Sequence, residues 1–138
     1  MEQYDDSLEI RLNTEKPPRD PAIRVVLLPK DTNRHGTIFG GIILSYIDLA
    51  GAVEVTKHTR QRIVTVSVEK VVFKEPVMVG EVVSFYTSTT RIGNSSISVH
   101  VDVEAMRGGV EEAHVTSADL TYVCVDDNGR PTPVLRIS

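Results

Sequence analysis

The sequence is poor in cysteine and in aromatic residues. It has one cysteine, Cys124, no tryptophan, and an aromatic content of only 5%. A single cysteine excludes an intramolecular disulfide and any zinc site built from several thiolates. The longest apolar stretch is interrupted by Asp48 and Glu54, which excludes a membrane-spanning helix. The acidic N-terminus is unlike a signal peptide, so we expect a reducing, cytoplasmic location and no membrane partner.

Positive charge is also scarce. Lys and Arg number 15 against 19 Asp and Glu, and the net charge is −4. Such a balance disfavours a nucleic-acid partner, because no basic surface is available to gather phosphates. The histidines at positions 58, 100 and 114 lack metal-ligand spacing, and we assign no role to the last two. Phosphate-binding loops and dinucleotide fingerprints are missing, so we expect neither a metal nor a redox cofactor.

The 138 residues correspond to one domain of ordinary globular composition, with 41% hydrophobic and 25% charged residues. Residues 1–21 are polar and carry three prolines, which predicts an N-terminal tail, although the alternation at 7–12 is compatible with a short edge strand. We predict the domain over residues 22–133 and a C-terminal tail over 134–138.

The chain has one long segment without alternation and several segments with period-two alternation. The apolar run from Ile42 to about His58 contains no proline and predicts a helix buried on most sides. Strands are predicted at 22–28, from 64 onward with a bulge at 70–73, and at 81–91, 97–105 and 113–125. Turns are expected at 76–80, 91–95, 108–109 and 126–129, where glycine recurs.

This order predicts an α+β fold in which one helix is wrapped by an antiparallel sheet of strands that follow one another through short turns. The lengths agree, because about 18 helical residues span ~27 Å and about nine strand residues span ~30 Å. This is the hotdog arrangement. Its long edge strands need partners, so we expect a dimer with a continuous sheet.

Asp48 is the first candidate for chemistry. On a helical wheel it shares a face with small and apolar residues, among them Gly41, Leu44 and Gly51, whereas Glu54 lies about 120° away. A carboxylate on an apolar wall is costly unless it is paired or used. A functional acid and a structural acid that finds a buried partner are both compatible with this pattern.

The segment before the helix supplies weaker candidates. Gly40 and Gly41 open the helix, where free N–H groups favour a negative oxygen, but tight packing at a turn explains the same pair. Asn33 is more often the centre of a local turn than a functional amide, and His35 is typical of a surface loop. Cys124 lies in an apolar strand and is interpreted as packing.

Taken together, motifs over residues 24–133 resemble those of the hotdog acyl-CoA thioesterases of the YciA and cytosolic acyl-CoA hydrolase type. The matching pieces run in order: Leu28 to Asn33, Gly36, Phe39-Gly40-Gly41, Asp48, Gly51-Ala52, Val64-Thr65-Val66, Phe73, Pro76-Val77, Val79 to Val83, Gly93 to Ser96, Thr121-Tyr122-Val123 and Asp127 to Pro131. The sequence departs from the family at His35, where a second Asn is frequent, and at Ile42, where a bulky aromatic residue is frequent.

The resemblance implies hydrolysis of an acyl-CoA to a carboxylic acid and CoA, in a homodimer that assembles as a trimer of dimers. It implies that Asp48 of one subunit and Asn33 of the other face the thioester and that the Gly41 N–H binds its oxygen. It further implies a substrate- and CoA-binding set: Gly40, Thr65, Val66, Ser67, Arg91, Gly93, Asn94, Ser95 and Ser96. CoA is here part of the substrate and product rather than a cofactor.

Two alternatives to hydrolysis stay open at this point. A hotdog module could bind acyl-CoA without turning it over, although Asp48 and Asn33 are both present here. A hotdog hydratase or dehydratase needs a histidine opposite an acid, and His35 would have to supply it. The residues also leave open whether Asp48 acts as general base or as nucleophile.

Overall fold

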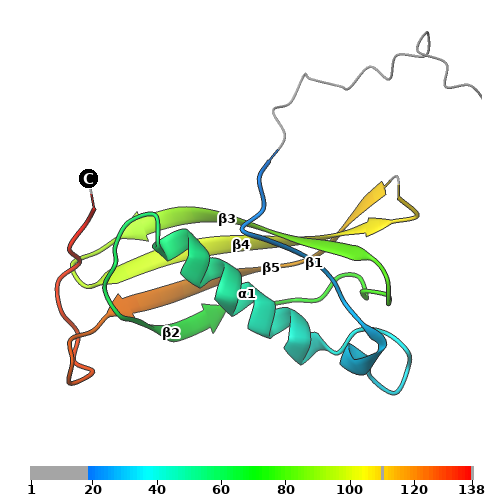
Figure 1. Cartoon of the computed structure of the whole chain (residues 1–138), viewed down its shortest axis with the longest axis horizontal. Helices are drawn as coiled ribbons and strands as arrows, with labels where there is room; N and C mark the ends of the chain where they lie inside the picture. The colour runs from blue at the N-terminus through cyan, green and yellow to red at the C-terminus, as the bar shows by residue number, and fades with distance from the viewer. Residues whose placement is uncertain (1–18, 110, 138) are drawn as a thin grey trace, which may run out of the picture.

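The structure is a computed structural model that describes residues 19–109 and 111–137. One long helix lies across the inner face of a curled five-stranded antiparallel sheet (Figure 1). This arrangement confirms the predicted α+β class. Residues 7–12, for which a short edge strand was considered, lie outside the described residues. In the part of the chain that the structure describes, no helix is long and apolar enough to cross a membrane.

Helix α1 (Gly40–Val55) begins two residues before the predicted segment and ends three residues before its predicted end. Six of its residues are buried against the sheet: Ile43, Ile47, Ala50, Gly51, Glu54 and Val55. On the other side Leu44, Leu49 and Val53 are 38%, 56% and 43% exposed. The prediction of a helix buried on most sides is therefore wrong for a single chain, which leaves one apolar side of the helix uncovered.

The strands are β1 (Ile23–Val26), β2 (Ile63–Glu69), β3 (Val82–Ile92), β4 (Ser96–Arg107) and β5 (Glu111–Cys124), and a short 3-10 turn, Pro29–Asp31, follows β1. Their order in the sheet is β1-β3-β4-β5-β2, with every neighbouring pair antiparallel. The β4–β5 hairpin turns at Gly108 and Gly109, which both adopt positive φ as the predicted glycine turn requires.

Strand β2 does not lie beside its sequence neighbour β3, as the expectation of consecutive pairing required. It pairs with β5 and forms an edge of the sheet. The connection after β2 leaves the edge at Lys70, whose φ is 59°, and continues along β5, where the Lys74 N–H donates to the Val115 carbonyl. The bulge predicted at 70–73 lies instead between Thr65 and Ser67. Twelve residues between the two strands allow this detour, which a short turn would forbid.

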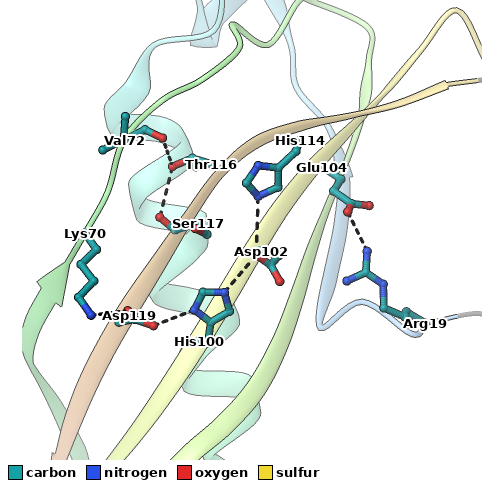
Figure 2. Close-up of polar contacts among 10 residues, drawn as sticks. All are labelled: Arg19, Lys70, Val72, His100, Asp102, Glu104, His114, Thr116, Ser117 and Asp119. Atoms are coloured by element: carbon teal, nitrogen blue, oxygen red, sulfur yellow. Dashed lines mark hydrogen bonds and ion pairs between the residues drawn. The ribbon is translucent and has the colours of Figure 1, made fainter.

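The two faces of the sheet differ in chemistry. Alternate residues of β4 are buried on the inner face and form the core with α1, among them Ile97, Val99 and Val101. The outer face of β4 and β5 carries a polar network, shown in Figure 2. His100 lies between Asp119, at 2.7 Å, and Asp102, at 3.1 Å. The polar side chains of this network alternate with the buried residues of β4, which accounts for the alternation of polar and apolar residues in the sequence.

The C-terminal residues run back along the domain. The Val134 N–H donates to the Asn94 carbonyl, and the Ile137 N–H donates to the His58 carbonyl. Cys124 is buried in β5 and has a raised thiol pKa because of that burial, in agreement with its interpretation as a packing residue. The domain boundaries at residues 22 and 133 remain predictions.

Candidate active site

The carboxylate of Asp48 is held by two hydroxyl groups from two strands. Its Oδ1 accepts a hydrogen bond from the Thr65 hydroxyl at 2.7 Å. The Tyr122 hydroxyl lies 3.1 Å from the same oxygen and 2.7 Å from the main-chain carbonyl of Asp48. Within the described part of the chain, Oδ2 has no hydrogen-bond donor. One oxygen is thus anchored, and the other is available on a half-buried side chain.

The pairing of β2 with β5 brings these two hydroxyls together. Thr65 lies directly opposite Tyr122, and both are on the inner face below the helix. The bulge that follows Thr65 changes the face of the sheet toward which the later side chains of β2 point. Gly51 completes the arrangement, because a Cβ at this position would lie 3.0 Å from Cζ of Tyr122 and would clash with its hydroxyl oxygen.

Tyr122 is only 2% exposed. Burial raises the pKa of its phenol, and the neighbouring Asp48 carboxylate raises it further by charge and hydrogen bonding. The phenol therefore stays protonated and can donate throughout the range in which proteins are folded. Sequence reasoning missed this residue as a site component, although Tyr122 was among the residues that carried the family resemblance.

Asn33 is tied to its own loop. Its Nδ2 donates to the Thr37 hydroxyl at 2.8 Å, and its Oδ1 accepts from the main-chain N–H of His35 and of Thr37. The local turn that we considered as the alternative is therefore present. One N–H of the amide carries no hydrogen bond to the described residues, so Asn33 can be both a turn residue and a donor.

The start of α1 has the properties expected of an oxyanion site. The N-cap residue is Phe39, which makes no side-chain cap, so no described side chain occupies the N–H groups of Gly40 and Gly41. A Cβ at Gly41 would lie 2.5 Å from the exposed ring of Phe39, which would have to move aside. The helix dipole adds partial positive charge at these N–H groups.

A single chain does not bring all the candidates together. Gly41 and Asp48 are seven residues apart on one helix, which separates them by about 10 Å along its axis. One thioester carbonyl cannot contact both. Asn33 lies in the loop that precedes the same end of the helix as Gly41.

A pocket of about 260 Å³ opens beside Gly40. Apolar side chains of Ile38, Ile43, Phe73 and Val77 line much of it, and Lys74 and Glu75 also contribute. The ring of Phe73 lies 3.5 Å from the place a Gly40 Cβ would take. The pocket therefore offers apolar space next to the uncapped N–H groups.

The predicted CoA-binding residues lie at one end of the sheet. Ile97, Tyr122 and Thr65 are aligned across β4, β5 and β2, so the turn at residues 93–96 and the start of β2 are about 10 Å apart. Arg91 and Asn94 are exposed there. The N–H of Gly93 was expected to be a donor to CoA, but it already donates to the Ser96 carbonyl at 2.8 Å.

The three residues assigned to CoA on β2 fall into two groups. Thr65 uses its hydroxyl for Asp48, so it belongs to the group of side chains around Asp48 as well as to the expected CoA strand. Val66 lies at the bulge and is 55% exposed, and Ser67 resumes the pairing with β5. In the described ranges no group of three or more His, Cys, Asp or Glu residues could hold a metal ion.

A family model described as the thioesterase superfamily matches residues 35–112, which is more than half of the chain. The chain belongs to the thioesterase superfamily. This thioesterase is 36% identical over 119 residues to the acyl-CoA thioester hydrolase YciA of Escherichia coli, covering 83% of this chain and 90% of the relative. It is 37% identical over 133 residues to an uncharacterized acyl-CoA thioester hydrolase of Buchnera aphidicola, covering 94% and 98%.

Solved structures of similar proteins show the same fold. A hexameric hotdog-fold thioesterase of Campylobacter jejuni superposes with a TM-score of 0.78 at 47% identity, over 83% of this chain and 90% of that one. A hexameric thioesterase of Yersinia pestis superposes with a TM-score of 0.81 at 36% identity, over 88% and 99%. The predicted hotdog fold and the family resemblance are confirmed.

Proposed function

We propose that this acyl-CoA thioester hydrolase works through sites shared by two copies of the chain, with Asp48 of one copy facing Gly41 and Asn33 of the other. The reaction cleaves an acyl-CoA to a carboxylic acid and CoA. The observation that carries the proposal is the Asp48 carboxylate, which is fixed through one oxygen and open at the other. Oδ2 is not a buried atom, so in the single chain it can meet a water molecule or a thioester.

The separation of about 10 Å between Gly41 and Asp48 supports a shared site, because one chain cannot place both at one carbonyl. The unpaired edge of β2 supports it as well. Val68 on this strand lies opposite the buried Leu120, on the face that carries α1, and is 43% exposed. The exposed side of α1, formed by Leu44, Leu49 and Val53, adds apolar surface suited to a second copy.

A two-fold dimer through this surface would bring the helices of two chains side by side and create two equivalent sites. The similar proteins of Campylobacter jejuni and Yersinia pestis are hexamers. We infer the same assembly here, as a trimer of such dimers.

Hydrolysis can follow either of two balanced routes. In the first, Asp48 accepts a proton from water, the water oxygen bonds to the thioester carbon, and the C–S bond breaks to release the CoA thiolate, which takes up the proton. In the second, Asp48 Oδ2 itself forms the new bond and expels the thiolate, and water then cleaves the mixed anhydride. In both routes the Gly41 N–H stabilises the negative oxygen of the tetrahedral intermediate.

The pocket beside Gly40 is the place we assign to the start of the acyl group. It adjoins the oxyanion donors and is lined by Ile38, Ile43, Phe73 and Val77. CoA would extend from the thioester along β2 to the turn at residues 93–96, where Arg91 offers positive charge and Ser95 and Ser96 offer hydroxyls.

Release of free thiol from a panel of acyl-CoAs, from acetyl to palmitoyl and including aromatic acyl groups, tests the proposal. We expect steady turnover that disappears in Asp48→Asn. Stoichiometric binding without thiol release would instead identify an acyl-CoA-binding module. Addition of water to an enoyl-CoA without thiol release would identify a hydratase. The cytoplasmic location expected from the sequence is tested separately, by fractionation of cells.

A further inference from the structure

The hydroxyl of Tyr122 is a buried polar group on the apolar inner face of the sheet. Its neighbours on β5, Leu120 and Cys124, are buried and apolar. A phenylalanine would fill the same space without the cost of burying a hydroxyl group. The hydroxyl instead reaches the helix, where it lies 2.7 Å from the main-chain carbonyl of Asp48 and 3.1 Å from its Oδ1.

The helix is shaped to admit this hydroxyl. Gly51 lies directly above the phenol, and any larger residue there would clash with the hydroxyl oxygen. Glycine in the middle of a helix destabilises it by roughly 0.5–1 kcal/mol relative to alanine. Glycine at position 51 thus weakens the helix but leaves room for the contact between Tyr122 and Asp48.

We propose that Tyr122 is a positioning residue that, together with Thr65, fixes Oδ1 of Asp48 so that Oδ2 is the oxygen that reacts. The inference rests on the proposed function, in which Asp48 carries the chemistry. Both hydroxyls approach Oδ1, at 2.7 and 3.1 Å, and Oδ2 has no donor in the described part of the chain. A carboxylate anchored in this way cannot rotate, so Oδ2 is held toward the open side.

The single O–H of Tyr122 is shared between the main-chain carbonyl of Asp48, at 2.7 Å, and Oδ1, at 3.1 Å, so it constrains both groups. It ties the helix at Asp48 to β5, whereas Thr65 ties only the side chain to β2. The two residues should therefore differ in effect. Loss of the Thr65 hydroxyl frees only the carboxylate, but loss of the Tyr122 hydroxyl frees both the carboxylate and the helix turn that carries it.

Burial and the neighbouring carboxylate raise the pKa of the Tyr122 phenol, so it remains a protonated donor beside Asp48. In our proposal the phenol positions Asp48 and does not contact the substrate. Removing that donor should therefore lower kcat and leave KM nearly unchanged. A merely structural role of the tyrosine would not separate kcat from KM in this way.

The test compares Tyr122→Phe with Tyr86→Phe, a matched control on the outer face of the sheet. Tyr86 is also buried, and its hydroxyl makes longer contacts, at 3.4 Å to Arg24 and 3.5 Å to Glu112. For Tyr122→Phe we expect kcat to fall about tenfold to a hundredfold, the range for a lost hydrogen bond to a charged group. KM should stay within about twofold.

Four outcomes would overturn the inference. A folded Tyr122→Phe enzyme with the parent kcat, beside an inactive Asp48→Asn, overturns the inference alone. An active Asp48→Asn enzyme overturns the proposed function and the inference with it. A loss of kcat in Tyr122→Phe that comes with a comparable rise in KM assigns Tyr122 to packing, and so does an equal loss of kcat in Tyr86→Phe.

Thr65→Val and Thr65→Ser provide an independent check on the anchored oxygen. The valine removes the hydroxyl at nearly constant shape and should lower kcat, whereas the serine keeps the donor and should restore most of it. If Thr65→Val matches the parent enzyme in kcat, Oδ1 is not anchored in the way we infer.

Discussion

Oε2 of Glu54 accepts a hydrogen bond from the hydroxyl of Thr89 at 2.7 Å, which joins the last turn of α1 to β3. Thr87 donates to the other carboxylate oxygen at 2.9 Å, and Lys57 contacts it at 2.7 Å. Glu54 is 4% exposed. An acid at the C-terminal end of a helix is disfavoured by the helix dipole, so these partners are needed to hold the charge.

We therefore predict that Glu54→Gln lowers the free energy of unfolding by about 1–3 kcal/mol, the range for hydrogen bonds to a buried charge. Burial alone would raise the pKa of Glu54, but the hydrogen bonds from Lys57, Thr89 and Thr87 lower it below its ordinary value. A lowered pKa gives stability that is present above the unfolded pKa of about 4.3 and is lost as pH falls through the folded pKa.

Thermal unfolding of the parent and of Glu54→Gln between pH 3 and pH 7 checks this prediction. The difference in Tm should be largest near neutral pH and shrink below about pH 4. Glu69→Gln, an exposed glutamate at the end of β2, is the control and should change little. A Tm difference that does not vary with pH would contradict the assigned role of the charge.

For His100 we predict that stability depends on pH in the opposite direction. The hydrogen bond to Asp119 raises its pKa, partial burial lowers it, and Asp102 raises it again, so the net shift is upward. Lys70 and His114 are the other charged or titratable groups of this network (Figure 2). A raised histidine pKa gives stability that is present in full below about pH 6.5 and is lost as pH rises through the folded pKa.

We expect His100→Asn to lower Tm by about 1–4 °C at pH 6, since the network is partly exposed, and by less at pH 9. His35→Asn, on an exposed loop residue, is the control and should give a flat difference. A larger loss of Tm at pH 9 than at pH 6 would contradict the prediction.

Arg91 is predicted to bind a phosphate of CoA rather than the acyl group. It is an exposed cation that follows a bulge in β3, next to the turn at residues 93–96. Arg91→Ala should raise KM for an acyl-CoA by about tenfold and leave KM for the matching acyl-pantetheine nearly unchanged. An equal rise for both substrates would remove the phosphate role.

A shared site predicts complementation between two inactive variants. Asn33→Ala and Asp48→Ala should each be inactive alone, but a mixed dimer contains one site with both parent residues. Random exchange of subunits would make half of the dimers mixed, so about a quarter of the sites should recover. Differently tagged subunits show that exchange has occurred. Exchange without recovered activity would place both residues in the same chain's site.

Much of the fold could be predicted from local pattern. The apolar run without period-two alternation after Gly40 predicted the helix. The alternation of apolar and polar residues around Val99 and Val101 predicted β4 and the residues on its inner face. The position of β2 could not be predicted this way. Periodicity identifies a strand but says nothing of its neighbour, and the route of the chain after Lys70 depends on contacts with β5 that have no local signal.

The same distinction applies to the site. Asp48 could be found because a carboxylate on an apolar helix face conflicts with its surroundings. Tyr122 looks like an ordinary core aromatic in the sequence, since its contact with Asp48 depends on the β2–β5 register and on Gly51 one turn along the helix. The Asx-type bonds of Asn33 were foreseen as an alternative, and they coexist with the role we propose.

The most direct test of the account is kcat/KM and a melting curve for Asp48→Asn. This change keeps the size of the side chain and its bond from Thr65 but removes the negative charge. We predict a folded protein whose kcat/KM has fallen at least about a hundredfold, the lower range of general-base assistance. A folded Asp48→Asn protein that keeps more than about a tenth of the parent kcat/KM would contradict the catalytic role of Asp48.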